Sequence, residues 1–296
     1  MRVGVSLRSS YPVDDVRTGA RWMVERAAAA REAGLDSLFV GDHHNTGPGV
    51  YYQNSPILGR LLAEWGDAPA GALYLLPLWN PVLVAEQVGT LASLAQGRFI
   101  LQCAVGGGAE QFAGMGVDLR ARARLFERNL DTVRRLLAGE TVGAARVAPV
   151  PPEPLEVWVG GSAPPALDRA ARLGDAWILG PWETDEEAAA QARAYRERCE
   201  VHGRVPSAVA LRRDIHVGED DADAQAVAGP VLEAGYRGFD PASTVVGGPE
   251  RVAERFAGYA EMGYTDVIVR HLADQQEEVL ASTARLAGVR KAVAGV

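Results

Sequence analysis

The chain alternates short apolar segments with amphipathic ones eight times between its first residues and its last. Segments with the alternation or β-branched content typical of strands lie at Arg2–Leu7, Asp36–Val40, Ala70–Leu75, Arg98–Ala104, Leu155–Gly160, Asp175–Leu179, Ala208–Val217 and Thr265–Arg270. Helical patterns follow at about Thr18–Ala33, Gln53–Glu64, Pro81–Ala95, Asp118–Ala138, Pro164–Leu173, Asp185–His202, Pro249–Met262 and Gln275–Ala294. Strands that alternate with helices of this length pair in parallel, and eight such units close into a ring. We therefore predict an α/β fold with a single (β/α)8 TIM barrel.

The same pattern indicates how many domains the chain forms. A chain of 296 residues has room for two average domains, but a (β/α)8 barrel of roughly 250 residues is one domain, and no linker-like stretch divides this sequence. We predict one domain over residues 1–296. An additional helix-like piece falls at about 220–244, and we interpret it as an insertion between the seventh strand and the last main-layer helix.

Charge and composition narrow the range of partners. A net charge of −8 and an isoelectric point near 5.3 argue against a nucleic-acid-binding surface, which needs clustered Lys and Arg. No apolar run reaches the roughly 20 residues of a membrane span, and the first residues lack the order of a secretory signal. The two cysteines, Cys103 and Cys199, fit a reducing compartment. We expect a cytoplasmic protein that acts on a small-molecule substrate.

Two glycine-rich turns are the strongest functional motif. Gly106-Gly107-Gly108 and Gly160-Gly161-Ser162-Ala163 each follow an expected strand and precede an expected helix. Residues without a Cβ let a ligand approach the backbone, and a helix N-terminus offers unpaired N–H groups to an anion. Ser162 is expected to cap the helix that begins at Pro164. The turns predict a phosphate-bearing cofactor, although the second motif alone also fits an ordinary strand-to-helix turn.

Polar residues follow the second expected strand, at the face of the barrel where active sites lie. Asp42, His43 and His44 place a carboxylate and two imidazoles at one position of this rim. They suit proton transfer or the orientation of a polar ring, with a metal site and plain structural hydrogen bonding as alternatives. Because adjacent residues of an extended segment point to opposite sides, His43 and His44 would not readily share one ion, which disfavours the metal.

Several other residues allow two interpretations. Cys103, in an expected strand, is either a small apolar filler or a reactive thiol. The tryptophans near strand ends either wall a flat aromatic cofactor or pack the core; they are Trp79, Trp158, Trp177 and Trp182. Segments 45–52, 180–183 and 237–244 are expected to shape the substrate pocket, with an apolar lining of Tyr51, Tyr52, Trp79 and Trp182.

The motifs together resemble a known family. The run Leu75-Leu76-Pro77-Leu78-Trp79-Asn80-Pro81-Val82-Leu83-Val84-Ala85-Glu86-Gln87, followed by Gly97-Arg98-Phe99-Ile100-Leu101, is similar to the third-to-fourth-strand signature of the luciferase-like monooxygenase superfamily. Trp158-Val159-Gly160-Gly161-Ser162 with Ala170-Ala171-Arg172-Leu173-Gly174-Asp175-Ala176-Trp177 resembles its fifth-to-sixth-strand signature. Gly247-Gly248-Pro249-Glu250 resembles the start of its late helix. The resemblance covers nearly the whole chain and implies a luciferase-like (β/α)8 barrel.

The resemblance also implies a cofactor and its position. Members bind FMN or the deazaflavin coenzyme F420 and are commonly dimers, so a homodimer is expected. The cofactor ring would lie near Asp42, Leu75, Leu76 and the turn Gly106, Gly107 and Gly108, with its phosphate held by Gly160, Gly161, Ser162 and Ala163. His43 occupies the place of the residue that handles protons in deazaflavin members. Some members carry Glu or Trp directly after the fourth-strand glycine turn, where this chain has Ala109 and then Glu110.

The resulting hypothesis is hydride transfer between coenzyme F420 and a small organic substrate, with His43 as proton donor or acceptor and Glu110 in reserve. This chain is close to a minimal barrel, which resembles the deazaflavin members more than the longer FMN oxygenases. The alternatives are an FMNH2-dependent monooxygenase that uses O2 and a partner flavin reductase, a metal-dependent barrel hydrolase built on Asp42, His43 and His44, and a flavin-binding protein without catalysis.

Overall fold

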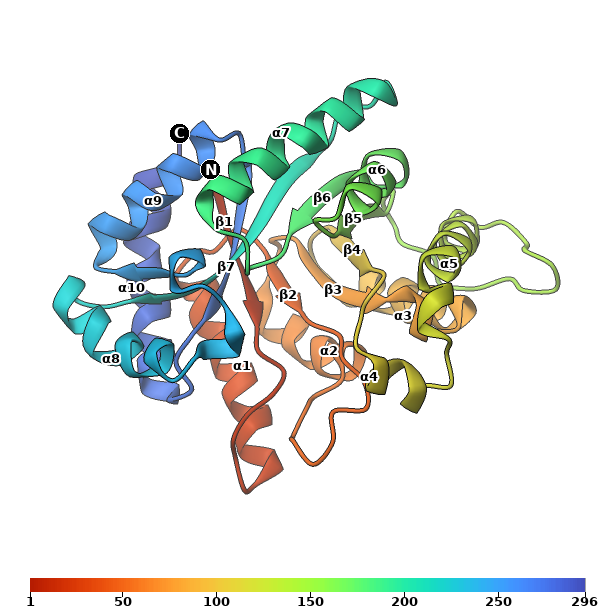
Figure 1. Cartoon of the computed structure of the whole chain (residues 1–296). Helices are drawn as coiled ribbons and strands as arrows, with labels where there is room; N and C mark the ends of the chain where they lie inside the picture. Colours follow the sequence, from red (N-terminus) through yellow and green to blue (C-terminus); the bar gives the residue numbers. More distant parts are fainter. Residues whose placement is uncertain (296) are drawn as a thin grey trace.

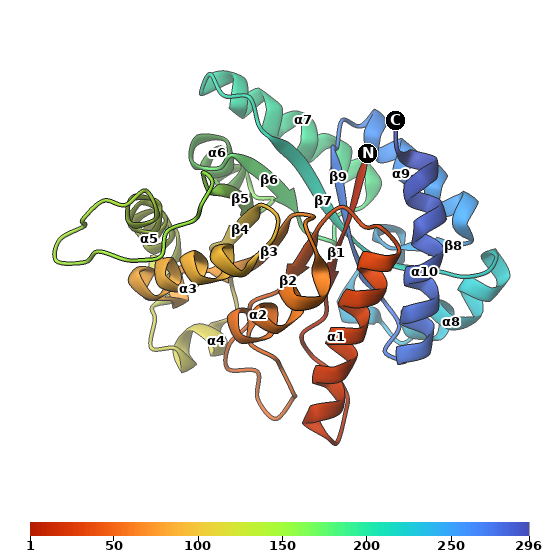
Figure 2. The same ribbon diagram turned by 180° about the vertical axis from the view of Figure 1, so that it is seen from behind.

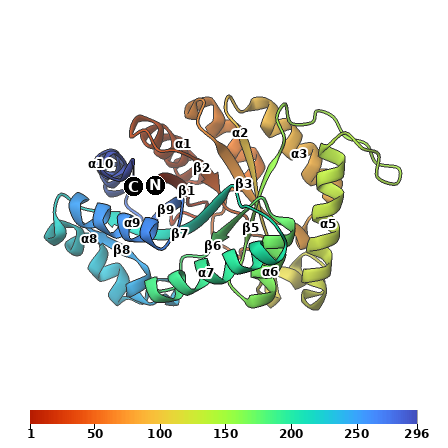
Figure 3. The same ribbon diagram turned by 90° about the horizontal axis from the view of Figure 1, so that it is seen from above.

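The computed structural model describes residues 1–295 and is built around a closed barrel of eight parallel strands (Figure 3). The barrel strands are β1 (Arg2–Leu7), β2 (Leu38–Val40), β3 (Ala70–Leu75), β4 (Phe99–Ala104), β5 (Glu156–Gly160), β6 (Ala176–Leu179), β7 (Ala208–Val217) and β9 (Asp266–His271). Neighbours along the chain pair from β1 to β6, and β9 pairs with β1. β7 closes the ring because it pairs with both β6 and β9. The predicted fold class is confirmed.

Helices surround the barrel (Figures 1 and 2). They are α1 (Val16–Glu32), α2 (Asn54–Trp65), α3 (Pro81–Leu94), α4 (Ala109–Gly114), α5 (Arg122–Leu137), α6 (Pro164–Leu173), α7 (Asp185–Val201), α8 (Asp221–Glu233), α9 (Pro249–Glu261) and α10 (Gln276–Val293). Over residues 1–295, none of these helices combines the length and the apolar character that crossing a membrane requires.

The structure departs from the predicted elements in four places. β2 begins at Leu38 rather than Asp36, because the Asp36 carboxylate accepts from the backbone N–H of Val3 and pairs with Arg290 instead of continuing the strand. The helix predicted from Asp118 is a 3-10 turn, η2 (Leu119–Ala121), followed by α5. Two elements were missed, α4 and the three-residue strand β8 (Val245–Gly247), because both are too short to show a period.

The segment predicted as an insertion contains helix α8 and two 3-10 turns, η3 (Tyr236–Gly238) and η4 (Pro241–Ser243). β8 follows it and pairs with the last residues of β7, outside the ring of eight. This places residues 234–244 beside the carboxyl end of β7. The segment therefore borders the face of the barrel on which the strands end.

Side chains inside the barrel close its amino-terminal end and leave the other end open. Phe39, Ile100, Trp158 and Ile268 pack against one another in the middle of the ring. Below them, Glu156 accepts hydrogen bonds from the Trp158 indole (2.9 Å) and the Ser207 hydroxyl (2.6 Å). Apolar packing with a hydrogen-bonded carboxylate beneath it thus fills the amino-terminal end of the ring.

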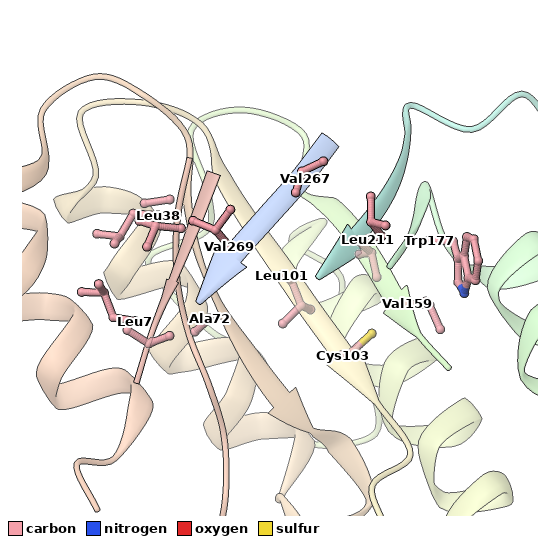
Figure 4. Packing of buried hydrophobic residues seen from close by; sticks show 14 of the residues in the cluster. Leu7, Leu38, Ala72, Leu101, Cys103, Val159, Trp177, Leu211, Val267 and Val269 are labelled. Carbon is pink, nitrogen blue, oxygen red and sulfur yellow. The ribbon is translucent and has the colours of Figure 1, made fainter. Parts of the chain in front are cut away.

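Side chains on the outer face of the strands pack under the helices (Figure 4). Leu7, Leu38, Val159 and Leu211 belong to this layer, and so does Cys103. The Cys103 thiol is fully buried beside the Trp158 carbonyl (3.7 Å), and its burial raises its pKa. Of its two interpretations, the structure therefore favours the apolar filler.

Replacing Gly71 by alanine tests the interior packing. Gly71 of β3 lies between Phe39 and Ile100, and a Cβ there would stand 2.1 Å from the Ile100 carbonyl oxygen. Since that oxygen belongs to a paired strand, we expect Gly71→Ala to lower the free energy of unfolding in urea by about 1–3 kcal/mol. Gly258→Ala on α9, where nothing lies within 4 Å, is the control and should raise it by about 0.5–1 kcal/mol. A neutral Gly71→Ala would contradict this packing.

Candidate functional site

Two adjoining cavities lie at the open end of the barrel. The first, which we call the glycine cavity, has a volume of about 470 Å³. Its lining is mostly apolar and comprises Ser6, Val40, Gly41, Leu73, Leu75, Gln102, Ala104, Val105, Gly106, Gly107, Gly160, Gly161, Ile178, Leu179, Gly180, Pro181, Trp182, Arg212, Ile268 and Arg270. Both glycine motifs of the sequence thus meet at one apolar site, which suits a flat ring.

The two glycine turns differ in how much space they leave for a ligand and in how they are held. Gly106 has φ +69°, a left-handed conformation that favours glycine, whereas a Cβ on Gly107 would meet no protein atom within 4 Å. The space beside Gly107 is therefore open to a ligand. At the second turn, the Trp177 indole donates to the Gly161 carbonyl (2.7 Å) and fixes the loop from the core side. Trp177 thus supports the site without lining it.

The predicted capping role of Ser162 is wrong. Helix α6 begins at Pro164, so Ala163 is its N-cap residue and no side chain accepts there. Two prolines occupy the first turn, where they remove N–H donors that a serine would otherwise cap. Ser162 and Ala163 stand at the rim beside Gly161, outside the lining of the glycine cavity.

Gln102 is a buried polar residue that sequence reasoning missed. It lies on β4 between the inward-facing Ile100 and Ala104, and it lines the glycine cavity. Its side chain is 7% exposed, and its Nε2 has no hydrogen-bond partner within residues 1–295. Because an unpaired buried donor costs free energy, a ligand acceptor in the cavity would satisfy it. The signal was a polar residue at an inward position of an alternating strand.

The second cavity is bordered by cations, and we call it the arginine cavity. Its volume is about 460 Å³, and its lining comprises Arg8, Ser9, Ser10, Gly41, Asp42, His43, Thr46, Gly49, Tyr51, Leu73, Arg212, Tyr236, Arg237 and Arg270. Gly41, Leu73, Arg212 and Arg270 line both cavities, so the two are continuous. A ligand in one would contact a ligand in the other at this junction.

Asp42 connects the ends of β2 and β3. Its Oδ2 accepts from the backbone N–H of Leu75 (2.7 Å) and from the Trp79 indole (2.8 Å), and its Oδ1 lies 3.1 Å from the His44 Nε2. The His44 backbone N–H donates to Gln111, whose amide donates to the Gly107 carbonyl. Asp42 and His44 therefore hold three rim loops in place, and Trp79 is a partner in this network rather than a cavity wall.

His43 turns the other way and lines the arginine cavity. Its ring stands 6.0 Å from the Tyr51 ring, and partial burial lowers its pKa below the ordinary 6.5. A lowered pKa keeps the imidazole neutral at neutral pH, where it can accept a proton. The structure thus separates the two adjacent histidines, one pointing into the protein and one into the cavity.

Besides Ser162 and Ala163, three more predicted site residues lie outside the lining of both cavities. Glu110, in the first turn of α4, is exposed, and its backbone carbonyl accepts from Asn45. Leu76 is buried, and its carbonyl accepts from Asn129 (2.8 Å). Gly108 precedes α4 at the outer edge of its turn. Of the four tryptophans predicted near strand ends, only Trp182 lines one of the two cavities. Tyr51 lines the arginine cavity, whereas Tyr52 packs against Tyr11.

The clustering of metal-binding side chains bears on the hydrolase alternative. No group of three or more His, Cys, Asp or Glu side chains within residues 1–295 has the geometry to hold a metal ion. Asp42 is instead engaged with Leu75, Trp79 and His44. The ligand set that a metal-dependent hydrolase would need is therefore not assembled in the described part of the chain.

The fold and the cavities define a class of protein, a (β/α)8 barrel with an apolar cavity between two glycine turns. Residues 1–243 match the family described as luciferase-like monooxygenase, and the chain belongs to this family. The Pseudomonas putida oxygenating constituent of 3,6-diketocamphane monooxygenase, solved with FMN, has the same fold, with a TM-score of 0.82, 16% identity and coverage of 99% of this chain and 98% of that one.

Two curated relatives extend the comparison. An uncharacterised protein of Mycobacterium tuberculosis is 34% identical over 135 residues, which is 43% of this chain and 46% of that protein. The matched part thus spans about half the length of that relative. An F420-dependent glucose-6-phosphate dehydrogenase of Nakamurella multipartita is 23% identical over 325 residues, covering 93% of this chain and 94% of that protein.

Removing the Asp42 carboxylate tests the network at the rim. Asp42→Ala would leave the buried Leu75 N–H and the Trp79 indole without acceptors, so we expect a loss of about 1–3 kcal/mol for each in urea unfolding. Asp131→Ala, on an exposed carboxylate of α5, is the control and should change stability by less than about 0.5 kcal/mol. Equal effects of the two substitutions would show that the network contributes nothing.

Proposed function

We propose that this protein is an oxidoreductase that uses the deazaflavin coenzyme F420 and exchanges a hydride with a small organic substrate. The observation that carries the proposal is the continuity of an apolar cavity between two glycine turns with a polar cavity containing His43. Family membership and the nearly full-length similarity to a glucose-6-phosphate dehydrogenase named as F420-dependent support it.

The residues of the glycine cavity fit such a cofactor. The space beside Gly107 is open, Leu75 and Ile178 provide apolar surface, and the unpaired Nε2 of Gln102 is available to a polar edge of a ring. We propose that the phosphate lies at the rim near Gly160, Gly161, Ser162 and Ala163, at the positive end of the α6 dipole, with donors from the turn because Pro164 and Pro165 have no N–H. When bound, the deazaflavin would supply two-electron hydride chemistry.

The protein would contribute orientation and proton transfer. Gly41 lines both cavities, and a Cβ there would stand 3.4 Å from the Arg270 Nη2 and from the Tyr51 hydroxyl. A substrate in the arginine cavity would therefore meet the cofactor at this residue. We assign to an imidazole nitrogen of His43 the proton that leaves or joins the substrate. Trp182, which lines the glycine cavity, packs edge-to-face against Phe239 (6.3 Å between ring centroids), and this contact would orient the indole beside the cofactor.

A second candidate is an FMNH2-dependent monooxygenase supplied by a flavin reductase. The fold shared with the FMN-bound Pseudomonas putida protein favours it, because one barrel evidently accommodates either ring. The two candidates differ in oxygen consumption and in cofactor preference. Glu110 as a reserve proton donor, the homodimer and the cytoplasmic location all stay predictions.

Gly107→Val tests the cofactor site. A Cβ at Gly107 meets no protein atom within 4 Å and its φ is not left-handed, so the variant should fold as the wild type does. Its side chain would occupy the space proposed for the ring, and we expect at least about a 100-fold loss of F420 affinity, roughly 2.7 kcal/mol. Titration of F420 into the apoprotein, followed by tryptophan fluorescence quenching, measures it.

Gly288→Val serves as the matched control, because Gly288 lies on the exposed face of α10 with nothing within 4 Å. It should bind F420 as the wild type does. A parallel titration with FMN decides between the two candidates: preference for FMN, with oxygen uptake on reduction, would replace the F420 proposal by the oxygenase. Binding of neither by the wild type would refute the cofactor site altogether.

The ionisation of His43 can be measured without knowing the substrate. Burial lowers its pKa, so an NMR titration should place the His43 imidazole below 6.5, with the signal identified by its loss in His43→Gln. The neutral base then persists to lower pH, and oxidation would slow only as the pH falls through the lowered pKa. On any alcohol that the wild type oxidises, His43→Gln should slow turnover by about 10²-fold or more.

His202→Gln is the control. His202 is the C-cap residue of α7 and pairs with Asp168, and neither residue lines either cavity. This substitution should leave turnover unchanged. A His43 pKa above 6.5, or a His43→Gln variant with full turnover and normal F420 binding, would remove His43 from the proposed proton transfer.

A further inference from the structure

The arginine cavity contains more cations than a neutral substrate requires. Arg8, Arg212, Arg237 and Arg270 all line it. Three carboxylates accompany them. Asp42 lines the cavity, and Asp214 and Asp274 pair with its arginines. Positive charge is therefore in surplus, although the whole chain has a net charge of −8.

Arg270 lies at the junction of the two cavities, half-buried and without a carboxylate at ion-pair distance. Its Nε donates to the Ser6 carbonyl (3.3 Å) and its Nη2 to the Ser6 hydroxyl (2.8 Å). Its Nη1 makes no hydrogen bond within residues 1–295. Burial, with the nearby charge of Arg212, lowers its pKa to about 9. Asp214 offsets part of the Arg270 charge from beyond ion-pair distance, and a guanidinium with a free donor in a cavity suits an anion.

Arg212 and Arg237 share one carboxylate. Asp214 accepts from Arg212 at both oxygens (3.0 and 3.2 Å) and from the Tyr236 hydroxyl (2.8 Å), and Arg237 lies 3.5 Å away. Burial favours protonation of Asp214, but the charges of the surrounding arginines hold its pKa below the ordinary range. Asp214 is thus saturated with donors, and it neutralises only one of the two guanidinium groups.

Arg237 reaches the cavity from a loop whose backbone is constrained. Its φ of +52° is left-handed, a conformation rare for a residue with a side chain, and Gly235 and Gly238 on either side are left-handed as well. Its guanidinium lies over the Phe239 ring, 5.0 Å from the centroid. The left-handed backbone of Arg237 costs free energy, and it holds a cation at the rim of the cavity. Such conformations cluster at functional sites.

We infer that the arginine cavity binds an oxyanion of the substrate, so that the substrate is a carboxylate or a phosphate ester whose reacting carbon faces the glycine cavity. Arg212 and Arg270, on strands β7 and β9, would form the fixed part of the site, and Arg8 and Arg237 would enclose the anion from the loops. Bidentate guanidinium pairing suits both kinds of oxyanion. This inference rests on the proposed function only in assigning the glycine cavity to the cofactor.

The test is calorimetric titration of inorganic phosphate, of malonate and of neutral glycerol into the purified protein at constant ionic strength. We expect both anions to bind and glycerol not to bind, and the tighter anion identifies the group. Arg237→Ala should weaken anion binding at least about 10-fold. Arg237→Lys should retain most of the binding, because lysine keeps the positive charge that alanine removes. Arg60→Ala, which removes an exposed arginine paired with Glu64 on α2, should change nothing.

Arg8→Ala, on a different element, is a second variant in case Arg237→Ala alters its loop. Absence of anion binding by the wild type, or equal binding by Arg237→Ala and Arg60→Ala, would overturn the inference. F420 affinity, measured on the same variants by fluorescence, separates it from the proposed function. If Arg237→Ala weakens F420 binding as much as anion binding, the arginines serve the cofactor and the inference fails. If F420 does not bind but anions do, the cofactor proposal fails alone.

Discussion

Everything at the site depends on the closure of the barrel through β7. This strand pairs with β6 at its start and with β9 along most of its length, which joins the two ends of an otherwise open sheet. Because all eight strands of the ring are parallel, closure brings all their carboxyl ends to one rim. Ser6, Gly41, Arg212 and Arg270, far apart in the sequence, meet there because of it.

The two cavities have different physical character although they share a wall. The glycine cavity is mostly apolar, with the unpaired Nε2 of Gln102 in its wall, whereas the arginine cavity concentrates charge. Charged groups at the edge of a barrel lose part of their hydration, so they are stable only with partners. Asp214 and Asp274 provide part of this compensation, and the remainder is available to a ligand. The division suits a flat cofactor beside a polar substrate.

Membership of the family does not by itself decide which cofactor ring a barrel binds. A protein solved with FMN and a relative named for F420 are both similar to this chain over most of its length, so the barrel itself does not select the ring. Selection must lie in side chains that touch the cofactor. In the proposed site the candidates are Leu75, Gln102, Ile178 and Trp182, which line the glycine cavity, and only Trp182 among them is exposed.

The regular part of the fold could be predicted from the sequence, and the short elements could not. Segments with a clear period, such as those of β7 and α6, were predicted with the bounds that the structure has. β8 and α4 have three and six residues, too few for a period to appear. The cap at α6 was misassigned because the sequence showed a serine near the helix but not which residue adopts the cap conformation.

The sequence alone determined the eightfold strand and helix pattern, the two glycine turns, and His43 at the rim, because each is carried by residues close together in the chain. The tertiary structure decided which of these meet and which do not. It turned His43 and His44 in opposite directions, left the Gln102 amide unpaired, and gathered four arginines from separate elements around one cavity. Those outcomes depend on barrel closure, which brings together residues that no local pattern relates.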